Sequence, residues 1–351
     1  MYSILANLLP PNASYGYTFK GYEHRRKMTL EVGMKISLIE PLGVPAETIE
    51  RLAANIRAAG HEFVHFEDKA SDASEQLRRA QGSEVVMIAN SPLPADVIKG
   101  IDTLKMIAVA FTGIDHVGLD ACRERDIMVC NCAGYSDTAV SELAVGLAID
   151  VLRKVRQGDH AARHGSTSAG LVGREIAGKT VGIVGCGKIG AATARLFKAF
   201  GARVLGYSRH VNPVAVSAGV EFTALDTLLR QSDIVSIHLP LNEQTRKSFG
   251  ASQIAAMREG SVLINCARGA IVDNDALADA LASGHVAGAG IDVFDMEPPL
   301  PADYPLVQAP NLILTPHVGF LTEESMERRA KIEFANVEAF LSGTPQNVCV
   351  L

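Results

Sequence analysis

The chain has 351 residues, which exceeds the size at which one hydrophobic core usually keeps growing and therefore predicts two domains. Its composition, 48% hydrophobic and 21% charged, is that of a folded globular enzyme and excludes a disordered or fibrous chain. The formal net charge of -6 provides no basic footprint for a nucleic-acid backbone or an anionic membrane, so we expect neither as a partner.

The distribution of apolar residues and cysteines indicates the compartment. No apolar run is long enough for a membrane helix, and the first residues lack the apolar stretch of a signal peptide, so we expect a cytoplasmic protein. The cysteines contain no C-x-x-C pair and no motif predicts a metal site, which favours buried free thiols. These cysteines are Cys122, Cys130, Cys132, Cys186, Cys266 and Cys349.

Residues 1–33 differ from the rest because they are rich in tyrosine and show no periodicity. We interpret them as an N-terminal extension, disordered or the product of a start assigned too early, and expect folded sequence from Met34.

From Lys35 the chain alternates short apolar runs with helical patterns, which predicts β-α-β units and a parallel sheet. A helix is expected over 46–59, where Gly60 ends it. Strands are expected over 35–39, 62–66, 84–89, 106–110 and 127–130.

A long helix after Ser136, apolar at helical spacing from Val140 to Val151, separates this series from a second one and is interpreted as a domain joint. Residues 157–178 are aperiodic and are expected to be a connection. Further strands are predicted over 180–184, 202–207, 233–239, 261–267, 287–293 and 311–315, with helices over 191–200, 276–281 and 322–341.

The strongest motif is G-x-G-x-x-G at Gly185, Gly187 and Gly190, between a predicted strand and a predicted helix. The first glycine permits a tight turn, the second a close approach of a pyrophosphate, and the third close packing of helix on strand. The helix N-terminus then faces the phosphates. This context favours dinucleotide binding over a glycine-rich turn without a ligand.

The next strand ends in Ser208 and Arg209, where an acidic residue would hold the ribose hydroxyls of NAD. Because no carboxylate repels a 2′-phosphate and Arg209 can pair with one, the sequence favours NADP(H). A solvated arginine beside an NAD(H) site is the alternative.

Three segments that each follow a predicted strand supply one arginine, one glutamate and one histidine. Arg268 can orient a substrate carboxylate with its planar guanidinium. His317 can protonate a carbonyl oxygen that gains charge as hydride arrives, and Glu297 would favour the charged imidazolium. Each residue alone has an ordinary structural explanation; the three in this order indicate a dehydrogenase site.

At these residues the chain resembles the D-isomer-specific 2-hydroxyacid dehydrogenase family, from about Met34 to the C-terminus. The resemblance implies an α/β protein with two doubly wound parallel sheets, a Rossmann cofactor domain inserted into a flavodoxin-like substrate domain. The implied limits are 34–136 and 318–351 for the substrate domain and 137–317 for the cofactor domain.

The resemblance also implies roles at matching positions. Arg268 would bind the substrate carboxylate and carbonyl, together with the backbone of Phe111, Thr112 and Gly113, and His317 would be the general acid and base supported by Glu297. Asp292 would face the nicotinamide. The other implied cofactor contacts are Gly185, Gly187, Lys188, Ile189, Gly190, Ser208, Arg209, His238, Pro240, Cys266 and Ala267, and Arg268 and His317 also reach the cofactor.

The implied reaction is hydride transfer between NAD(P)H and C2 of a small 2-oxo acid of the glyoxylate, hydroxypyruvate or pyruvate type, by a homodimer. A phosphorylated substrate is disfavoured because residues 108–117 contain no lysine or arginine. One alternative is a dinucleotide-sensing, corepressor-like binding protein with the same fold, which would bind cofactor without turnover. Formate dehydrogenase relatives fit less well, because they carry glutamine at the position of Glu297.

Overall fold

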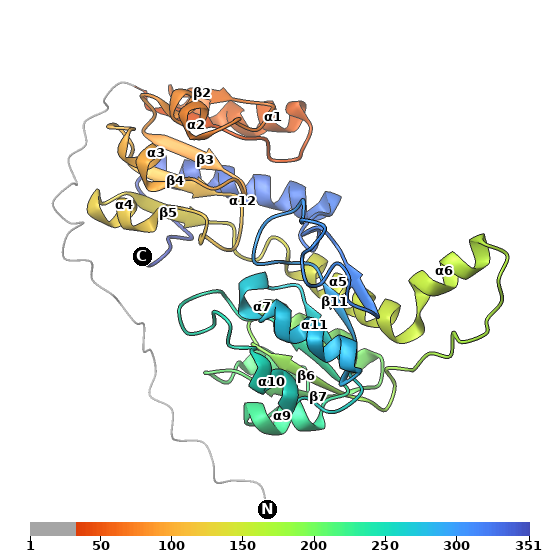
Figure 1. Cartoon of the computed structure of the whole chain (residues 1–351). Helices are drawn as coiled ribbons and strands as arrows, with labels where there is room; N and C mark the ends of the chain where they lie inside the picture. Colours follow the sequence, from red (N-terminus) through yellow and green to blue (C-terminus); the bar gives the residue numbers. More distant parts are fainter. Residues whose placement is uncertain (1–32) are drawn as a thin grey trace, which may run out of the picture.

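The computed structural model describes residues 33–351. Two parallel sheets, each flanked by helices, form two halves of the molecule (Figure 1). The expectation for residues 1–33 lies outside the described residues, except at Gly33.

The first sheet has the strand order β2-β1-β3-β4-β5, which is the flavodoxin-like order, so that part of the predicted fold class is confirmed. Its strands are β1 (Lys35–Leu38), β2 (Glu62–His65), β3 (Val85–Ile88), β4 (Met106–Val109) and β5 (Met128–Asn131). The helices between them are α1 (Ala46–Ala58), α2 (Ala73–Ala80), α3 (Ala95–Lys99) and α4 (Leu119–Glu124).

The second sheet has the order β12-β11-β10-β9-β6-β7-β8, the Rossmann order extended by one strand. Its strands are β6 (Thr180–Val184), β7 (Arg203–Tyr207), β8 (Glu221–Phe222), β9 (Ile234–Ile237), β10 (Ser261–Asn265), β11 (Val286–Ile291) and β12 (Leu312–Leu314). Its helical segments are α7 (Lys188–Ala199), α8 (Pro213–Ser217), α9 (Leu225–Gln231), α10 (Ala251–Ala256), η2 (Gly269–Ile271) and α11 (Asn274–Ser283). The short edge strand β8 was not predicted.

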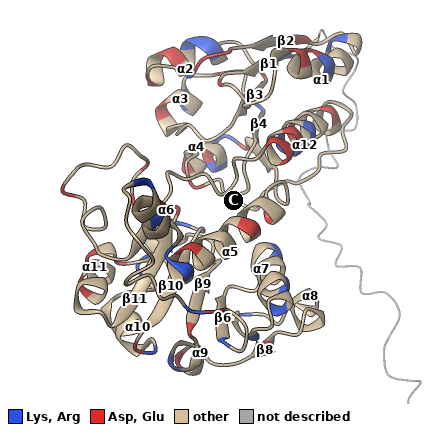
Figure 2. Ribbon diagram, turned by 90° about the vertical axis from the view of Figure 1, so that its right-hand side faces the viewer, with Lys and Arg blue, Asp and Glu red and all other residues tan. Residues whose placement is uncertain are grey.

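The apolar composition of the central strands explains why these sheets form. Every residue of β3, β4 and β9 is buried, as expected for parallel strands covered by helices on both faces. Charged residues lie mostly on helices and loops (Figure 2). Polar loops therefore follow the strands, and ligands bind at the carboxyl ends of the strands in such sheets.

Two long helices connect the halves. Helix α5 (Asp137–Arg153) packs against α7, β10 and β11 of the second half. The last helix, α12 (Glu323–Leu341), returns to the first half, where it packs on α1 and β4 (Figure 1). Thr322 and Ser325 form a capping box at its start. The limits that we predicted for the two domains stay predictions.

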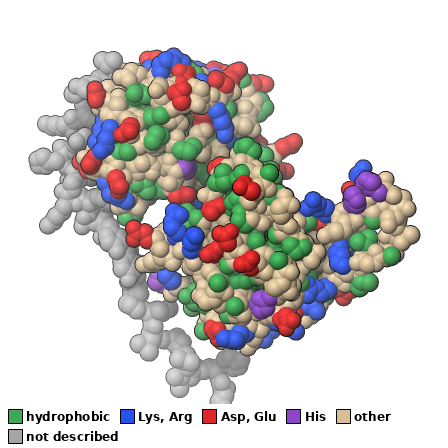
Figure 3. Space-filling view, in the orientation of Figure 1, with side chains coloured by type: hydrophobic (Ala, Val, Ile, Leu, Met, Phe, Trp, Pro, Cys, Tyr) green, Lys and Arg blue, Asp and Glu red, His purple; other side chains and the backbone are tan. Residues whose placement is uncertain are grey.

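The expectation that residues 157–178 are only a connection was wrong, because helix α6 (Val155–Arg163) occupies the first part. None of its residues is buried, so the segment has no apolar stripe that periodicity could detect. An ion pair between Asp159 and Arg163, spaced i to i+4, supports the helix. The helix projects from the second half, and histidine side chains are exposed on this arm (Figures 1 and 3).

Within residues 33–351 no helix is both long and apolar enough to cross a membrane. The cysteines are free thiols, all buried except the partly exposed Cys349, as the sequence predicted.

Candidate active site

The predicted catalytic segments converge between the two halves because each begins where a strand of a parallel sheet ends. Arg268 follows β10, Glu297 follows β11, and His317 follows β12. Phe111 follows β4 of the first sheet, and its ring centroid lies 6.0 Å from that of His317. The site is therefore built from both halves, as open α/β sheets allow at their carboxyl edges.

His317 and Glu297 form a hydrogen-bonded pair. Nδ1 of His317 lies 3.2 Å from both Glu297 carboxylate oxygens. This hydrogen bond lowers the pKa of Glu297, although partial burial acts in the opposite direction. With Nδ1 occupied, Nε2 is the ring nitrogen that can meet a substrate, and it has no partner among residues 33–351.

Aromatic rings enclose the other sides of this imidazole. His317 packs edge to face against Phe320, with ring centroids 5.4 Å apart, and Phe320 packs against Phe111 at 4.8 Å. These apolar faces limit the access of water to the imidazole. His317 keeps only 16% of its side chain exposed, whereas Glu297 keeps 68%.

Asp292 holds the turn that carries His317. It is buried, and its carboxylate accepts hydrogen bonds from Thr315 Oγ1 at 2.5 Å, Val318 N at 2.8 Å and Gly319 N at 2.8 Å. Burial raises the pKa of Asp292, and these hydrogen bonds offset part of that effect. The turn needs such support because His317 has a φ of 58°, in the left-handed region.

Arg268 is fixed by its own loop and by the opposite half. Asn265 closes the loop, because its side chain accepts from Ala267 N at 3.0 Å and donates to Arg268 O at 3.1 Å. The Arg268 guanidinium donates from Nε and Nη2 to Asp115 Oδ1, each at 3.3 Å, and from Nη1 to Ala267 O at 2.8 Å. Burial acts to raise the pKa of Asp115, but the charge and hydrogen bonds of Arg268 outweigh it and lower that pKa.

The loop after β4 lies directly against this guanidinium. A Cβ atom added to Gly113 would lie 1.8 Å from Arg268 Nη2, so only glycine leaves room there. Within the described chain, the amides of Thr112 and Gly113 donate no hydrogen bond. Two free amides beside a guanidinium can accept a carboxylate.

The glycine-rich loop has the geometry that a dinucleotide needs. Gly185 has a φ of 98°, and a Cβ there would lie 2.5 Å from His238 O. A Cβ on Gly190 would lie 2.0 Å from Gly185 O, whereas the space beside Gly187 is open to 4 Å. The loop leads into α7, whose first amides have no acceptor in the helix and can bind phosphate oxygens.

The remaining predicted cofactor residues surround this crevice at neighbouring strand ends. Ser208 and the exposed Arg209 follow β7, and Arg209 Nη1 lies 3.4 Å from Gln244 Oε1. His238 follows β9, and its Nε2 shares a hydrogen bond of 2.9 Å with Ser236 Oγ. Burial lowers the pKa of His238 to about 4. The others are Pro240 after β9, Cys266 and Ala267 after β10, and Lys188 and Ile189 at the start of α7.

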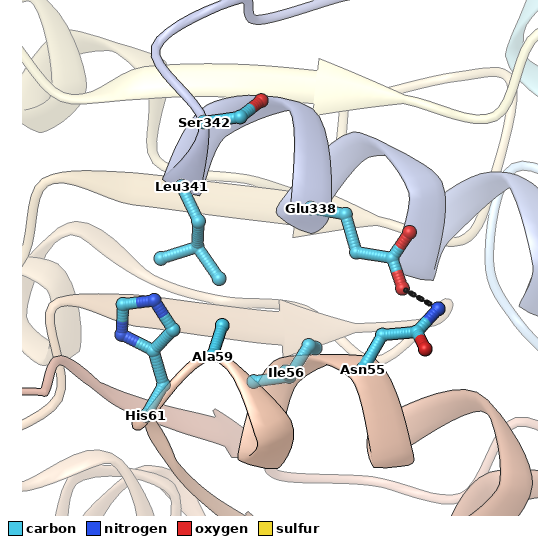
Figure 4. Close-up of a pocket in the computed structure, with 7 residues that line it drawn as sticks. All are labelled: Asn55, Ile56, Ala59, His61, Glu338, Leu341 and Ser342. Atoms are coloured by element: carbon cyan, nitrogen blue, oxygen red, sulfur yellow. Dashed lines mark hydrogen bonds between the residues drawn. The ribbon is translucent and has the colours of Figure 1, made fainter.

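A hollow on the described surface lies away from these residues. It is a groove of about 310 Å³ between α1 and α12, lined among others by Asn55, His61 and Glu338 (Figure 4). An Asn55 to Glu338 hydrogen bond of 3.1 Å crosses it. It contains none of the predicted site residues, whereas Arg268, Glu297 and His317 follow the carboxyl ends of strands β10, β11 and β12. We therefore place the candidate site in the cleft between the two halves.

The structure brings the predicted residues together in two groups. In the first group, Arg268 lies against the loop of Thr112 and Gly113. In the second group, His317 contacts Glu297 and Phe111. Asp115 was missed because a loop aspartate carries no periodic signal. The expected contact of Asp292 with the nicotinamide stays a prediction, and within the protein both of its carboxylate oxygens accept hydrogen bonds.

Reduction of a carbonyl needs a hydride carrier, a proton donor and a cation that orients the substrate. The Rossmann crevice can bind the hydride carrier, His317 can donate the proton, and Arg268 can orient the substrate. This combination places the chain among two-domain nicotinamide-dependent dehydrogenases. Comparison with known proteins narrows this class. Residues 145–319 match the family model described as D-isomer specific 2-hydroxyacid dehydrogenase, NAD binding domain.

Curated relatives extend the match to most of the chain. A glyoxylate reductase of Thermofilum pendens is 37% identical over 277 residues, covering 77% of this chain and 81% of the relative. A glycerate dehydrogenase of Methylorubrum extorquens is 37% identical over 310 residues, covering 85% and 96%. The structure of an acyclic imino acid reductase in complex with NADPH and D-Arg superposes with a TM-score of 0.81, at 28% identity over 90% of this chain and all of that one.

The chain therefore belongs to the D-isomer-specific 2-hydroxyacid dehydrogenase family. It is an NAD(P)-dependent oxidoreductase that transfers a hydride between the nicotinamide and C2 of a 2-oxo acid. The alternative of a dinucleotide-sensing protein is not favoured, because these relatives are named as enzymes.

Proposed function

We propose that the chain reduces small, unphosphorylated 2-oxo acids of the glyoxylate and hydroxypyruvate type to their D-2-hydroxy acids, with NADPH as the preferred donor. The observation that carries this proposal is that the loop after β4 contacts both groups: Phe111 packs on His317, which pairs with Glu297, and Asp115 binds Arg268. The names of the two curated relatives support the substrate type. Pyruvate stays a candidate.

The protein residues would act on the substrate as follows. Arg268 binds the carboxylate, and the free amides of Thr112 and Gly113 bind it from the other side. His317 donates a proton from Nε2 to the carbonyl oxygen as negative charge develops there, and Glu297 stabilises the imidazolium through Nδ1. Bound nicotinamide supplies the hydride. Phe111 and Phe320 exclude water from this region.

Asp292 acts in this proposal through the turn. The Asp292 carboxylate accepts from Thr315 Oγ1 before His317 and from the Val318 and Gly319 amides after it, which holds the turn so that Nδ1 of His317 meets Glu297. A direct contact between Asp292 and the nicotinamide would use the acceptor capacity that remains on Oδ2.

The preference for NADPH rests on the end of β7. Ser208 leaves no carboxylate that would repel a 2′-phosphate, and the exposed Arg209 is a cation within reach of that position. The imino acid reductase structure shows NADPH in a relative of the same fold. Arg209→Ala should raise the NADPH KM at least tenfold and leave the NADH KM unchanged. Arg203→Ala, at the other end of β7, is the matched control; an unchanged NADPH KM in the Arg209 variant would leave NADH as the preferred donor.

We also propose a homodimer formed through α5 and the projecting α6. No residue of α6 is buried in the single chain, and Val155 is 52% exposed. A second copy could cover this arm. Sedimentation should give twice the mass of the chain, and a monomer at micromolar concentration would contradict this assignment.

The cytoplasmic location expected from the sequence stays a prediction.

The reaction itself is tested with purified protein and a panel of 2-oxo acids. We expect turnover of glyoxylate and hydroxypyruvate, and we expect His317→Ala to reduce kcat by about a hundredfold or more while cofactor still binds. Tight cofactor binding without any turnover by the wild-type protein would contradict the proposed reaction and favour a sensor.

A further inference from the structure

The hydrogen bonds of Arg268 leave a defined part of its guanidinium unused. An arginine has five N–H donors: one on Nε and two each on Nη1 and Nη2. In the structure Nε and one Nη2 hydrogen are directed at Asp115 Oδ1, and one Nη1 hydrogen at Ala267 O. One hydrogen on Nη1 and one on Nη2 remain. One donor on each terminal nitrogen can bind a carboxylate through two parallel hydrogen bonds.

The contact with Asp115 is the one that joins the two halves at this point. Asp115 lies in the loop after β4, and Arg268 lies 153 residues later, after β10. Only Oδ1 of Asp115 is engaged, and both contacts are 3.3 Å long. The backbone at Gly113 approaches the same contact, because a Cβ there would lie 1.8 Å from Arg268 Nη2 and 2.7 Å from Asp115 Oδ1.

We propose that Asp115 is a positioning residue for Arg268, which holds one edge of the guanidinium across the cleft so that the Nη1 and Nη2 pair stays directed at the substrate carboxylate. This inference rests on the proposed role of Arg268 in substrate binding. Asp115 itself touches neither substrate nor cofactor. It acts by removing the rotational freedom of a side chain that has several rotatable bonds, so the substrate does not have to order that side chain when it binds.

A competing expectation makes this proposal easy to test. Asp115 carries a negative charge close to the place where a second carboxylate would bind, and the two charges repel each other. If repulsion dominates, removal of the Asp115 charge strengthens substrate binding. If positioning dominates, removal weakens it.

The test compares Asp115→Asn and Asp115→Ala with the wild-type enzyme. We expect the KM for the 2-oxo acid to rise about threefold to tenfold in Asp115→Asn and tenfold or more in Asp115→Ala, with the NADPH KM unchanged. The matched control is Asp120→Asn, which removes the same charge from α4, where Asp120 pairs with Arg123. An unchanged or lower KM for the 2-oxo acid in both Asp115 variants overturns the proposal.

Binding of oxamate to the complex of enzyme and NADPH, followed by nicotinamide fluorescence, gives a readout that does not need turnover. Its Kd should rise in parallel with KM in the Asp115 variants. In an Arg268→Lys background, which lacks the planar fork, the same Asp115 substitutions should change the oxamate Kd less than twofold. Equal effects in both backgrounds mean that Asp115 acts on the fold and not through Arg268, which overturns the proposal.

The two measurements also separate this inference from the proposed substrates. If the wild-type enzyme turns over no 2-oxo acid but its oxamate affinity depends on Asp115 and Arg268 together, the substrate proposal fails and the positioning role stands. If the wild-type complex binds no oxamate, both fail.

Discussion

Glu333 provides a stability prediction that follows directly from its surroundings. It lies in α12, is fully buried, and neither carboxylate oxygen has a hydrogen-bond partner among the described residues. Burial raises its pKa well above 4.5, and the nearby charge of Arg329 offsets only part of this effect. The Nε and Nη2 of Arg329 donate to Leu42 O, and no hydrogen bond joins Arg329 to Glu333 in the described chain. Glu333 therefore keeps its proton to higher pH in the folded chain than in the unfolded chain.

The consequence for stability has a definite sign. Below about pH 4 the carboxyl is protonated in both the folded and the unfolded chain, so Glu333→Gln should change the free energy of unfolding little. As the pH rises, the unfolded chain releases the proton and the folded chain keeps it, which destabilises the wild-type protein by about 1.4 kcal/mol per pH unit. The advantage of the Gln variant should therefore grow as the pH rises from about 5 toward 7.

The assay is urea unfolding of both proteins followed by circular dichroism at several pH values in this range. Glu324→Gln, at an exposed position of the same helix, is the control and should show no such slope. A stability difference between Glu333→Gln and wild type that stays constant from pH 5 to pH 7 would refute the reasoning, because it would mean that Glu333 ionises alike in both states.

Three further predictions concern the site. Gly113→Ala should raise the KM for the 2-oxo acid at least tenfold, because the added methyl group meets Arg268 Nη2; Gly146→Ala, where a Cβ has open space, is the control in steady-state assays. Asp292→Asn should lower the free energy of unfolding by about 1–3 kcal/mol, since an amide hydrogen would face the N–H of Gly319; no loss in urea unfolding would argue against the role of this carboxylate in the turn. Glu297→Gln should lower kcat for reduction, because an amide stabilises the imidazolium less than a carboxylate does; an unchanged kcat would show that the pair with His317 is not functional.

The parts of the fold that could be predicted from the sequence are those with a local signal. The run from Val181 to Gly190 combines an apolar strand, a glycine pattern and a helix start, so it indicates its own structure. Arg268 and His317 could be assigned to one edge of a sheet, because each follows an apolar strand and all parallel strands end on the same side.

The parts that could not be predicted depend on contacts between distant segments or on burial. The pairing of Asp115 with Arg268 exists only because the two halves meet, and no local pattern marks it. Glu333 follows Arg329 by four residues, which on a helix is typical of an exposed ion pair, yet both side chains are buried without pairing. Helix α6 contains few apolar residues and none of its residues is buried, so apolar periodicity did not predict a helix there.

The central claim is that this chain reduces a small 2-oxo acid with His317 as the proton donor. The measurement that tests it most directly is the oxidation of NADPH and NADH by the purified protein, followed by nicotinamide absorbance, with glyoxylate, hydroxypyruvate, pyruvate and phenylpyruvate. We predict turnover with one of the small acids, a D-configured product where C2 is a stereocentre, and a loss of about a hundredfold or more in His317→Ala. Cofactor binding without turnover of any of these acids, or full activity in His317→Ala, would contradict the account.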